Sequence, residues 1–159
     1  MPIPPSIVTR PGALLVIAAR TGQERANARL AAMGLNVRMC GVLNLLADEG
    51  AQSQHEIGSK LSIDRTTMVE LVDDLEREGI LKRETNPRDR RAHLIKLTSG
   101  GKAKQKRAMK AFDDAADEFF APLSGTERRQ LAAMLKRLLA IPDAHPVPSP
   151  DRPLEQSSP

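Results

Sequence analysis

Two short helical patterns, separated by only three residues and followed directly by two strand patterns, constrain this chain more than any other feature. Residues 53–56 (SQHE) have the S-x-x-E form of a capping box, which predicts the start of a short helix. Residues 62–64 (SID) break that helix, and either Ser62 or Asp64 can cap the next one. The second helix carries apolar residues at 68, 71, 72 and 75, which form one stripe, and it ends at Gly79. The pair is typical of a helix-turn-helix.

A β-hairpin is expected immediately after these two helices. Residues 80–85 (ILKRET) and 92–98 (AHLIKLT) mix apolar and polar side chains as half-buried strands do. Their inward side chains are expected to be Leu81, Leu94 (or Ile95) and Leu97. Residues 86–91 (NPRDRR) begin with the turn signal Asn-Pro and form the tip. This hairpin would be the wing of a winged helix-turn-helix.

Helices are expected on both sides of this region. Pro11 can open a first helix that stops at Gly34, and Asn36 can cap a second that ends before Gly50. A long helix starts at Thr98 or Ser99, with apolar positions that include Ala103, Met109, Phe112, Ala116, Phe119 and Phe120. A second capping box at residues 124–127 (SGTE) opens the last helix. The expected fold class is mainly α with a small β-hairpin wing (α+β).

Composition narrows the function classes. The chain has three Phe and no Trp or Tyr, so its core must be built from aliphatic side chains, which favours helices. The longest apolar run, residues 13–19, is too short to span a bilayer and a poor fit to a signal peptide, so we expect a cytoplasmic protein. One Cys excludes an internal disulfide framework, and the scattered Cys and three His offer no metal-ligand spacing. We expect no metal, no cofactor and no enzymatic activity.

Positive charge is concentrated in one segment. Residues 82–110 hold eleven Lys or Arg and two acidic residues, a net charge of +9, whereas the whole chain carries +4, so the remainder carries −5. A basic segment in an otherwise acidic protein indicates a polyanionic partner for one face. A helix-turn-helix with a basic wing suits double-stranded DNA, because its second helix can enter the major groove while the wing reaches phosphates or the minor groove.

Candidate DNA contacts fall into three groups. The recognition helix would present Arg65, Thr66, Thr67 and Glu70 to base edges or phosphates. The wing would contribute Arg88, Asp89, Arg90 and Arg91, and further phosphate contacts would come from Ser53, Gln54 and Lys102. For Lys102, Lys104, Lys106, Arg107 and Lys110, a solvated face stays open as the alternative to phosphate contact. Residues 64–79 hold six acids against two bases, an unusual balance for a helix in a DNA groove.

Residues 61–101 resemble the recognition helix and wing of MarR-family transcriptional regulators. The motifs that carry the resemblance are DRTT at the helix start (64–67), LVDDLEREG (71–79), DRR at the wing tip (89–91) and LTSGG (97–101). The resemblance implies a homodimer on a pseudo-palindromic operator, most often a repressor released by a small-molecule effector or by oxidation. It also implies that Asp89 pairs with an arginine to fix the tip, while Arg90 and Arg91 contact DNA.

The same resemblance suggests a domain organisation. Residues 1–10 would be a flexible N-terminus, 11–34 and 99–141 the helical dimerisation region, 35–98 the DNA-binding lobe, and 142–159 a disordered Pro/Ser-rich tail. Family ligands usually bind between the two regions, which makes Met33, Met39 and Cys40 candidate pocket residues. Cys40 lies in an apolar helical pattern, so a buried core thiol is favoured over a redox sensor.

Other functions were weighed against these motifs. A metal-sensing winged helix is disfavoured by the few Cys and His residues. The dimerisation domain of a methyltransferase would need a long nucleotide-binding domain after it. A non-sequence-specific or protein-binding winged-helix module stays open, and so does a thiol-based redox-sensing regulator that uses Cys40.

Overall fold

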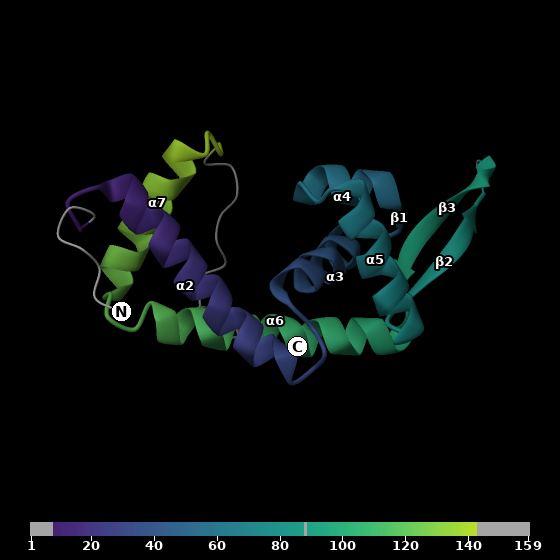
Figure 1. The fold of residues 1–159 in the computed structure, drawn as a ribbon, viewed down its shortest axis with the longest axis horizontal. Coiled ribbons are helices and arrows are strands. Elements are labelled where there is room, and N and C mark those ends of the chain that lie inside the picture. Colours follow the sequence, from purple (N-terminus) through teal and green to yellow (C-terminus); the bar gives the residue numbers. More distant parts are fainter. Residues whose placement is uncertain (1–7, 88, 143–159) are drawn as a thin grey trace, which may run out of the picture. The chain divides into compact units, whose positions relative to one another are not determined.

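The structure is a computed structural model that describes residues 8–87 and 89–142, with only the backbone described at 89–92. The chain divides into two compact units, Met1–Phe119 and Phe120–Pro159. The first contains helices α2 to α6 and three strands, and the second contains α7 (Figure 1). This architecture confirms the mainly helical fold with a small sheet. The predicted tail, residues 142–159, lies outside the described residues apart from Pro142.

Two helices precede the helix-turn-helix. Helix α2 (Pro11–Ala31) has Pro at its first turn, as expected, and buries Ala26 and Leu30. Helix α3 (Val37–Glu49) is capped by Asn36, whose side chain accepts a hydrogen bond from the Met39 backbone at 2.9 Å. It ends at Gly50, where φ is 83°.

The helix-turn-helix consists of α4 (Gln54–Leu61) and α5 (Arg65–Arg77). Asp64 caps α5, and Ser62 instead takes the left-handed conformation that ends α4. Gly58 faces the Ile63 carbonyl oxygen, which a Cβ atom would approach to 3.1 Å, so the tight turn favours glycine there. The predicted stripe of Met68, Leu71, Val72 and Leu75 is confirmed as buried.

The sheet has three antiparallel strands in the order β1-β3-β2: β1 (Gln52–Ser53), β2 (Leu81–Asn86) and β3 (Asp89–Leu97). The sequence pattern missed β1, because two residues are too few to show an alternation. The predicted tip at 86–91 was too long, since β3 already begins at Asp89. Of the two candidates for the inward side chain, Ile95 is buried and Leu94 is only half-buried.

Helix α6 (Ser99–Phe119) holds the base of the wing. The Thr98 hydroxyl donates to the Gly79 carbonyl at 2.7 Å and accepts from the Gly101 backbone at 2.9 Å. A Cβ atom at Gly101 would lie 2.0 Å from the Ile80 carbonyl oxygen, so only glycine fits. The buried helix face uses Ala108 and Ala115, whereas Ala103, one of the apolar positions named from the sequence, is exposed.

The core confirms the aliphatic composition expected from the sequence. Its largest fully buried side chains come from α2 to α5, β2 and β3 (Leu30, Val42, Leu43, Ile57, Met68, Val72, Leu75, Leu81 and Ile95). Because α5 and the wing strands share this core, the recognition helix and the wing are held on one platform. In the second unit, α7 (Gly125–Leu138) begins with the predicted capping box of Ser124 and Glu127. None of the described helices is both long and apolar enough to cross a membrane.

Candidate nucleic-acid interface

The outer face of α5 carries most of the predicted recognition residues. Arg65, Thr66 and Glu70 are exposed, and Val69 keeps 39% of its surface accessible between them. This face lies opposite the buried stripe, so its side chains are free to meet a ligand without disturbing the core. The first turn of such a helix is the part that enters a major groove.

Thr67 differs from its neighbours, because its hydroxyl donates to the Asp64 carboxylate at 2.6 Å. The Thr67 backbone donates to the other oxygen of that carboxylate at 2.9 Å. These bonds, the side-chain one first, lower the pKa of Asp64 below its usual value. Thr67 therefore stabilises the helix start, and Thr66 is the more available of the two threonines.

Ser53 is used in the same way at the start of α4. Its hydroxyl and backbone N–H donate to the Glu56 carboxylate at 2.7 and 2.8 Å, which lowers the pKa of Glu56. Gln54, in contrast, lines an open pocket of about 850 Å³ between α4 and α5. Arg65 lines the same pocket, so Gln54 and Arg65, which are eleven residues apart, belong to one surface. Sequence reasoning named both residues and missed the pocket.

Most of the acidic residues on α5 have cationic partners. Arg83 of β2 donates to Asp73 at 2.5 Å and to Glu76 through both its guanidinium and its backbone, the latter at 3.1 Å. Burial alone would lower the pKa of Arg83, but the hydrogen bonds to the two carboxylates raise it. Arg77 pairs with Asp74 at 2.8 Å, and Lys104 of α6 pairs with Glu78 at 3.6 Å.

Glu70 is the exception among the acidic side chains of α5, because it makes no ion pair with any described residue. The acid-rich helix thus presents far less negative charge than its sequence indicates. Sequence reasoning missed the Arg83 cluster, because its partners lie on a separate helix, seven and ten residues away.

The wing strands carry ion pairs of their own. Glu84 pairs with Lys82 at 2.5 Å and with Lys96 at 3.5 Å, and the hydrogen bond from Lys82 leads in lowering the Glu84 pKa. Figure 1 shows the hairpin extending away from α5. Arg88 lies outside the described residues, as do the side chains of Asp89, Arg90 and Arg91, so their roles stay predictions.

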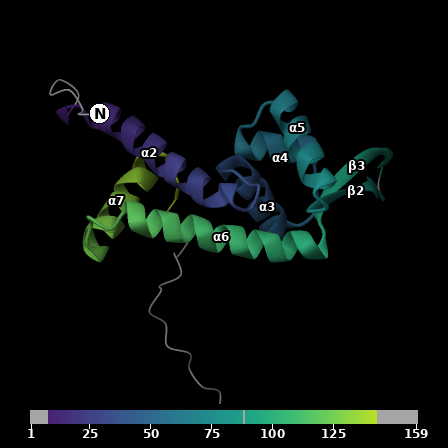
Figure 2. The same ribbon diagram turned by 60° about the horizontal axis from the view of Figure 1, so that its bottom comes forward.

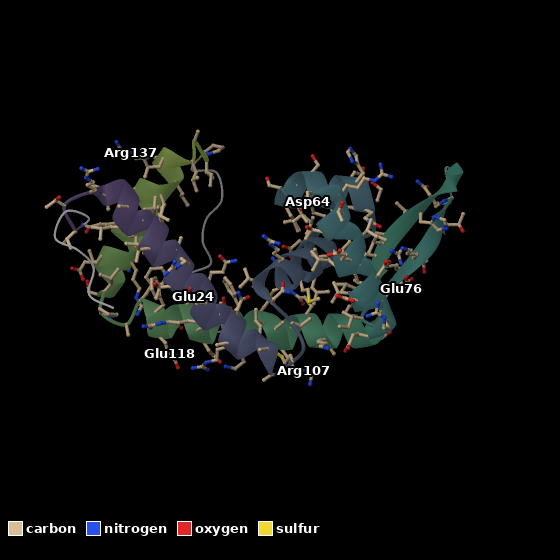
Figure 3. The ribbon with its side chains drawn as sticks, in the orientation of Figure 1. Glu24, Asp64, Glu76, Arg107, Glu118 and Arg137 are labelled. Carbon is tan, nitrogen blue, oxygen red and sulfur yellow. The ribbon has the colours of Figure 1, made fainter. Side chains whose placement is uncertain are left out.

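Lys102 is not brought together with Ser53 and Gln54. Lys102 is exposed on α6, and α3 lies between α6 and α4 within the first unit (Figures 1 and 2). In Figure 3, Arg107 on the same helix points away from the side that carries Asp64. Helix α6, which carries Lys102, is therefore separated from α4 by α3.

The candidate pocket residues Met33, Met39 and Cys40 pack on the core. Cys40 is 3% exposed, and its thiol lies 3.7 Å from the Met109 sulfur. Burial, and then the negative charge of Asp113, raises the pKa of the Cys40 thiol. The prediction of a buried core thiol is confirmed, and Met33 and Met39 are half-buried beside it. Across residues 8–87 and 89–142, no group of three or more His, Cys, Asp or Glu is placed to hold a metal ion.

Comparisons with known proteins agree with this geometry. The model of the MarR family matches residues 36–93. The HTH-type transcriptional regulator PrsX of Escherichia coli is 33% identical over 129 residues, which are 80% of this chain and 78% of PrsX. The matches to these curated relatives cover between 63% and 82% of the relative's own length. For the relative matched over 63%, a regulatory protein of Thauera aromatica, this chain spans less than two thirds of the length.

Two of the solved structures to which this chain is similar contain a bound partner, operator DNA in one and a natural ligand in the other. A mutant MarR from E. coli, complexed with operator DNA, has a TM-score of 0.74 and 25% identity, and the match covers 83% of this chain and 95% of that one. The PcaV transcriptional regulator from Streptomyces coelicolor, in complex with its natural ligand, has a TM-score of 0.69 and 27% identity, with 89% and 99% covered.

Proposed function

Because this chain belongs to the MarR family of transcriptional regulators, we propose that it is a sequence-specific DNA-binding repressor that acts as a homodimer and is released by a small molecule. Its relatives are regulators and not enzymes. The observation that carries the proposal is the exposed start of α5, fixed beside the wing on one core, with the acids behind it paired.

In this proposal, α5 enters the major groove. Arg65 donates to guanine or to a phosphate, Thr66 contacts a phosphate or a thymine methyl group, and Glu70 accepts from the amino group of cytosine. The wing reaches the neighbouring minor groove with Arg90 and Arg91, where the negative potential favours arginine. Arg83 supports both elements, because it neutralises two carboxylates that would otherwise repel phosphates.

Exposed apolar side chains support the homodimer. On α2, Leu14, Leu15 and Val16 are 37%, 45% and 68% exposed, and on α7, Met134 and Leu138 are 53% and 74% exposed. Each helix, considered within its own unit, offers apolar surface that a second copy can cover. The dimerisation region at 11–34 and 99–141, and a pseudo-palindromic operator that mirrors its two-fold axis, follow from this proposal.

Release by a small molecule is proposed by analogy with PcaV, whose structure contains its natural ligand. A ligand that binds at the junction near Met33 and Met39 would shift α2 relative to α3 and so change the separation of the two DNA-binding lobes. Release by oxidation of Cys40 is the weaker alternative, because the thiol is buried and its pKa is raised. We place the regulator in the cytoplasm, with its DNA.

The proposal is tested by titrating a random-sequence duplex at low salt and measuring fluorescence anisotropy. The double variant Arg90→Ala/Arg91→Ala should weaken binding by roughly tenfold or more, because it removes two cations that meet the DNA from each protomer. Arg129→Ala/Arg137→Ala, which removes the same charge from α7, is the matched control and should bind as the wild type does. Equal binding by all three proteins would contradict the wing assignment.

A further inference from the structure

We propose that the outer face of α6 is a second, sequence-independent surface that binds the phosphate backbone of duplex DNA, so that one protein can hold two DNA segments. The proposal rests on the function proposed above, in which the first segment occupies α5 and the wing. The basic α6 face is defined here as Lys102, Lys106, Arg107 and Lys110. All four residues are exposed, and the opposite side of the helix is buried through Gly101, Ala108 and Ala115.

The spacing of the basic α6 face matches an extended polyanion. Lys102, Lys106 and Lys110 recur at intervals of four residues, which places them on one side of the helix. At the helical rise they span about 12 Å, a length over which duplex DNA presents several phosphates. Arg107 lies beside this row. The face can therefore bind more than one phosphate at a time.

Three of the four cations on this face have no ionic partner among the residues that the structure describes. Lys102, Lys106 and Arg107 make no ion pair with any residue that the structure describes. The acidic end of the same helix is different, because Asp114 pairs with Lys110 at 3.0 Å and Glu118 pairs with Arg29 of α2. Asp114 and Glu118 are thus paired inside the unit, whereas Lys102, Lys106 and Arg107 face solvent. These three cations favour an outside anion.

The arrangement is also unfavourable for the helix itself. The first turn of α6 contains no acidic residue and its last turn no basic one, although the helix dipole favours acids at the N-terminus and bases at the C-terminus. Helix stability therefore does not account for a cationic first half. A bound anion would reduce the repulsion among these cationic side chains. It would also offset their unfavourable interaction with the positive end of the helix dipole.

Part of this face points away from the duplex proposed for α5 and the wing. Figures 1 and 2 place α3 between α6 and α4, and in Figure 3 Arg107 points away from the side of Asp64. A duplex on α5 therefore does not reach Arg107. The partner is duplex DNA, because the face lacks the large apolar side chains that insert into a membrane and the aromatic side chains that stack on single strands.

A two-duplex capture experiment tests the proposal. A biotinylated duplex that carries the site enriched by the protein from random DNA is fixed to beads, loaded with protein and offered a fluorescent duplex of unrelated sequence. The wild type should retain the second duplex. Lys102→Ala/Lys106→Ala/Arg107→Ala should bind the first duplex normally but lose retention of the second by roughly tenfold, with a salt slope smaller by about 2–3.

The charge-conserving variant Lys102→Arg/Lys106→Arg/Arg107→Lys is the control and should capture both duplexes. Equal retention by the alanine variant, or binding of anionic phospholipid vesicles without retention of the second duplex, would overturn the proposal. If the wild type fails to bind the first duplex, the proposed function fails instead. In that case the unrelated duplex is titrated directly with the wild type and both variants. The alanine variant alone should lose salt-dependent binding if the basic α6 face binds DNA.

Discussion

Replacement of Arg83 should weaken both the fold and DNA binding, because this side chain connects the wing to the recognition helix. Its guanidinium contacts Asp73 and Glu76 of α5 from strand β2. Arg83→Ala leaves those two carboxylates without a cation, next to the surface proposed to meet phosphates. The change removes no group that is proposed to touch DNA, so any loss of binding is indirect.

The magnitude follows from the exposure of the three side chains. Arg83 is 28% exposed, Asp73 48% and Glu76 37%, so solvent screens the pairs in part. Exposed ion pairs contribute up to about 1 kcal/mol and hydrogen bonds to charged groups about 1.5–3 kcal/mol. We therefore expect Arg83→Ala to lower the free energy of unfolding by about 1–2 kcal/mol, which corresponds to about 2–8 °C in Tm for a chain of this size.

Thermal melting followed by circular dichroism, at one protein concentration, measures the loss of stability. Anisotropy with a random duplex, well below the melting temperature, should show binding weakened by roughly tenfold because of the two exposed carboxylates. Arg77→Ala is the matched control, since Arg77 is 74% exposed and, among the described residues, forms an ion pair with Asp74 alone. Arg83→Lys should be intermediate in stability and in DNA binding, because lysine keeps the positive charge but cannot donate to both carboxylates with the planar geometry of a guanidinium. If Arg83→Ala melts and binds as Arg77→Ala does, the supporting role of Arg83 is refuted.

Three further predictions concern other parts of the site. Glu70→Gln should change which base pair is preferred at one position of each half-site while leaving the salt slope unaltered, as measured by selection from random duplexes. Cys40 should react with a thiol reagent at least about tenfold more slowly in the native protein than in urea, and peroxide should leave DNA binding of wild type and Cys40→Ala equal. Ser53→Ala should cost about 1 kcal/mol of stability through loss of the helix cap. Ser53 lowers the pKa of Glu56, so in the wild type the interaction stabilises the fold at neutral pH and is lost as pH falls from the usual pKa of Glu through the lower pKa of the folded state. In urea unfolding measured at a series of pH values, the stability of Ser53→Ala should therefore fall less on acidification than that of the wild type.

Local signals made much of the fold predictable. Both capping boxes act over three residues, so their residue types alone place the helix starts at Ser53 and Ser124. The stripe on α5 is equally local, because its spacing determines which face is buried. These local signals were enough to identify the helix-turn-helix.

Contacts between distant segments were not predictable in the same way. Strand β1 is defined by its pairing with Ile95, more than forty residues away, and two residues carry no pattern of their own. The buried face of α6 uses Ala108 and Ala115, small residues whose burial depends on which helices pack against them. The partners of Arg83 depend on how β2 folds back along α5, which no spacing in the sequence reveals. The exposed cations of α6 were recognised as a cluster, but their position away from α5 required the structure.

The central claim, that this protein is a dimer that reads a specific site, is tested most directly by selecting bound duplexes from a random library and sequencing them. The account predicts enrichment of one pseudo-palindrome whose half-sites are about one helical turn apart. Binding without enrichment, or no binding at low salt, would contradict it.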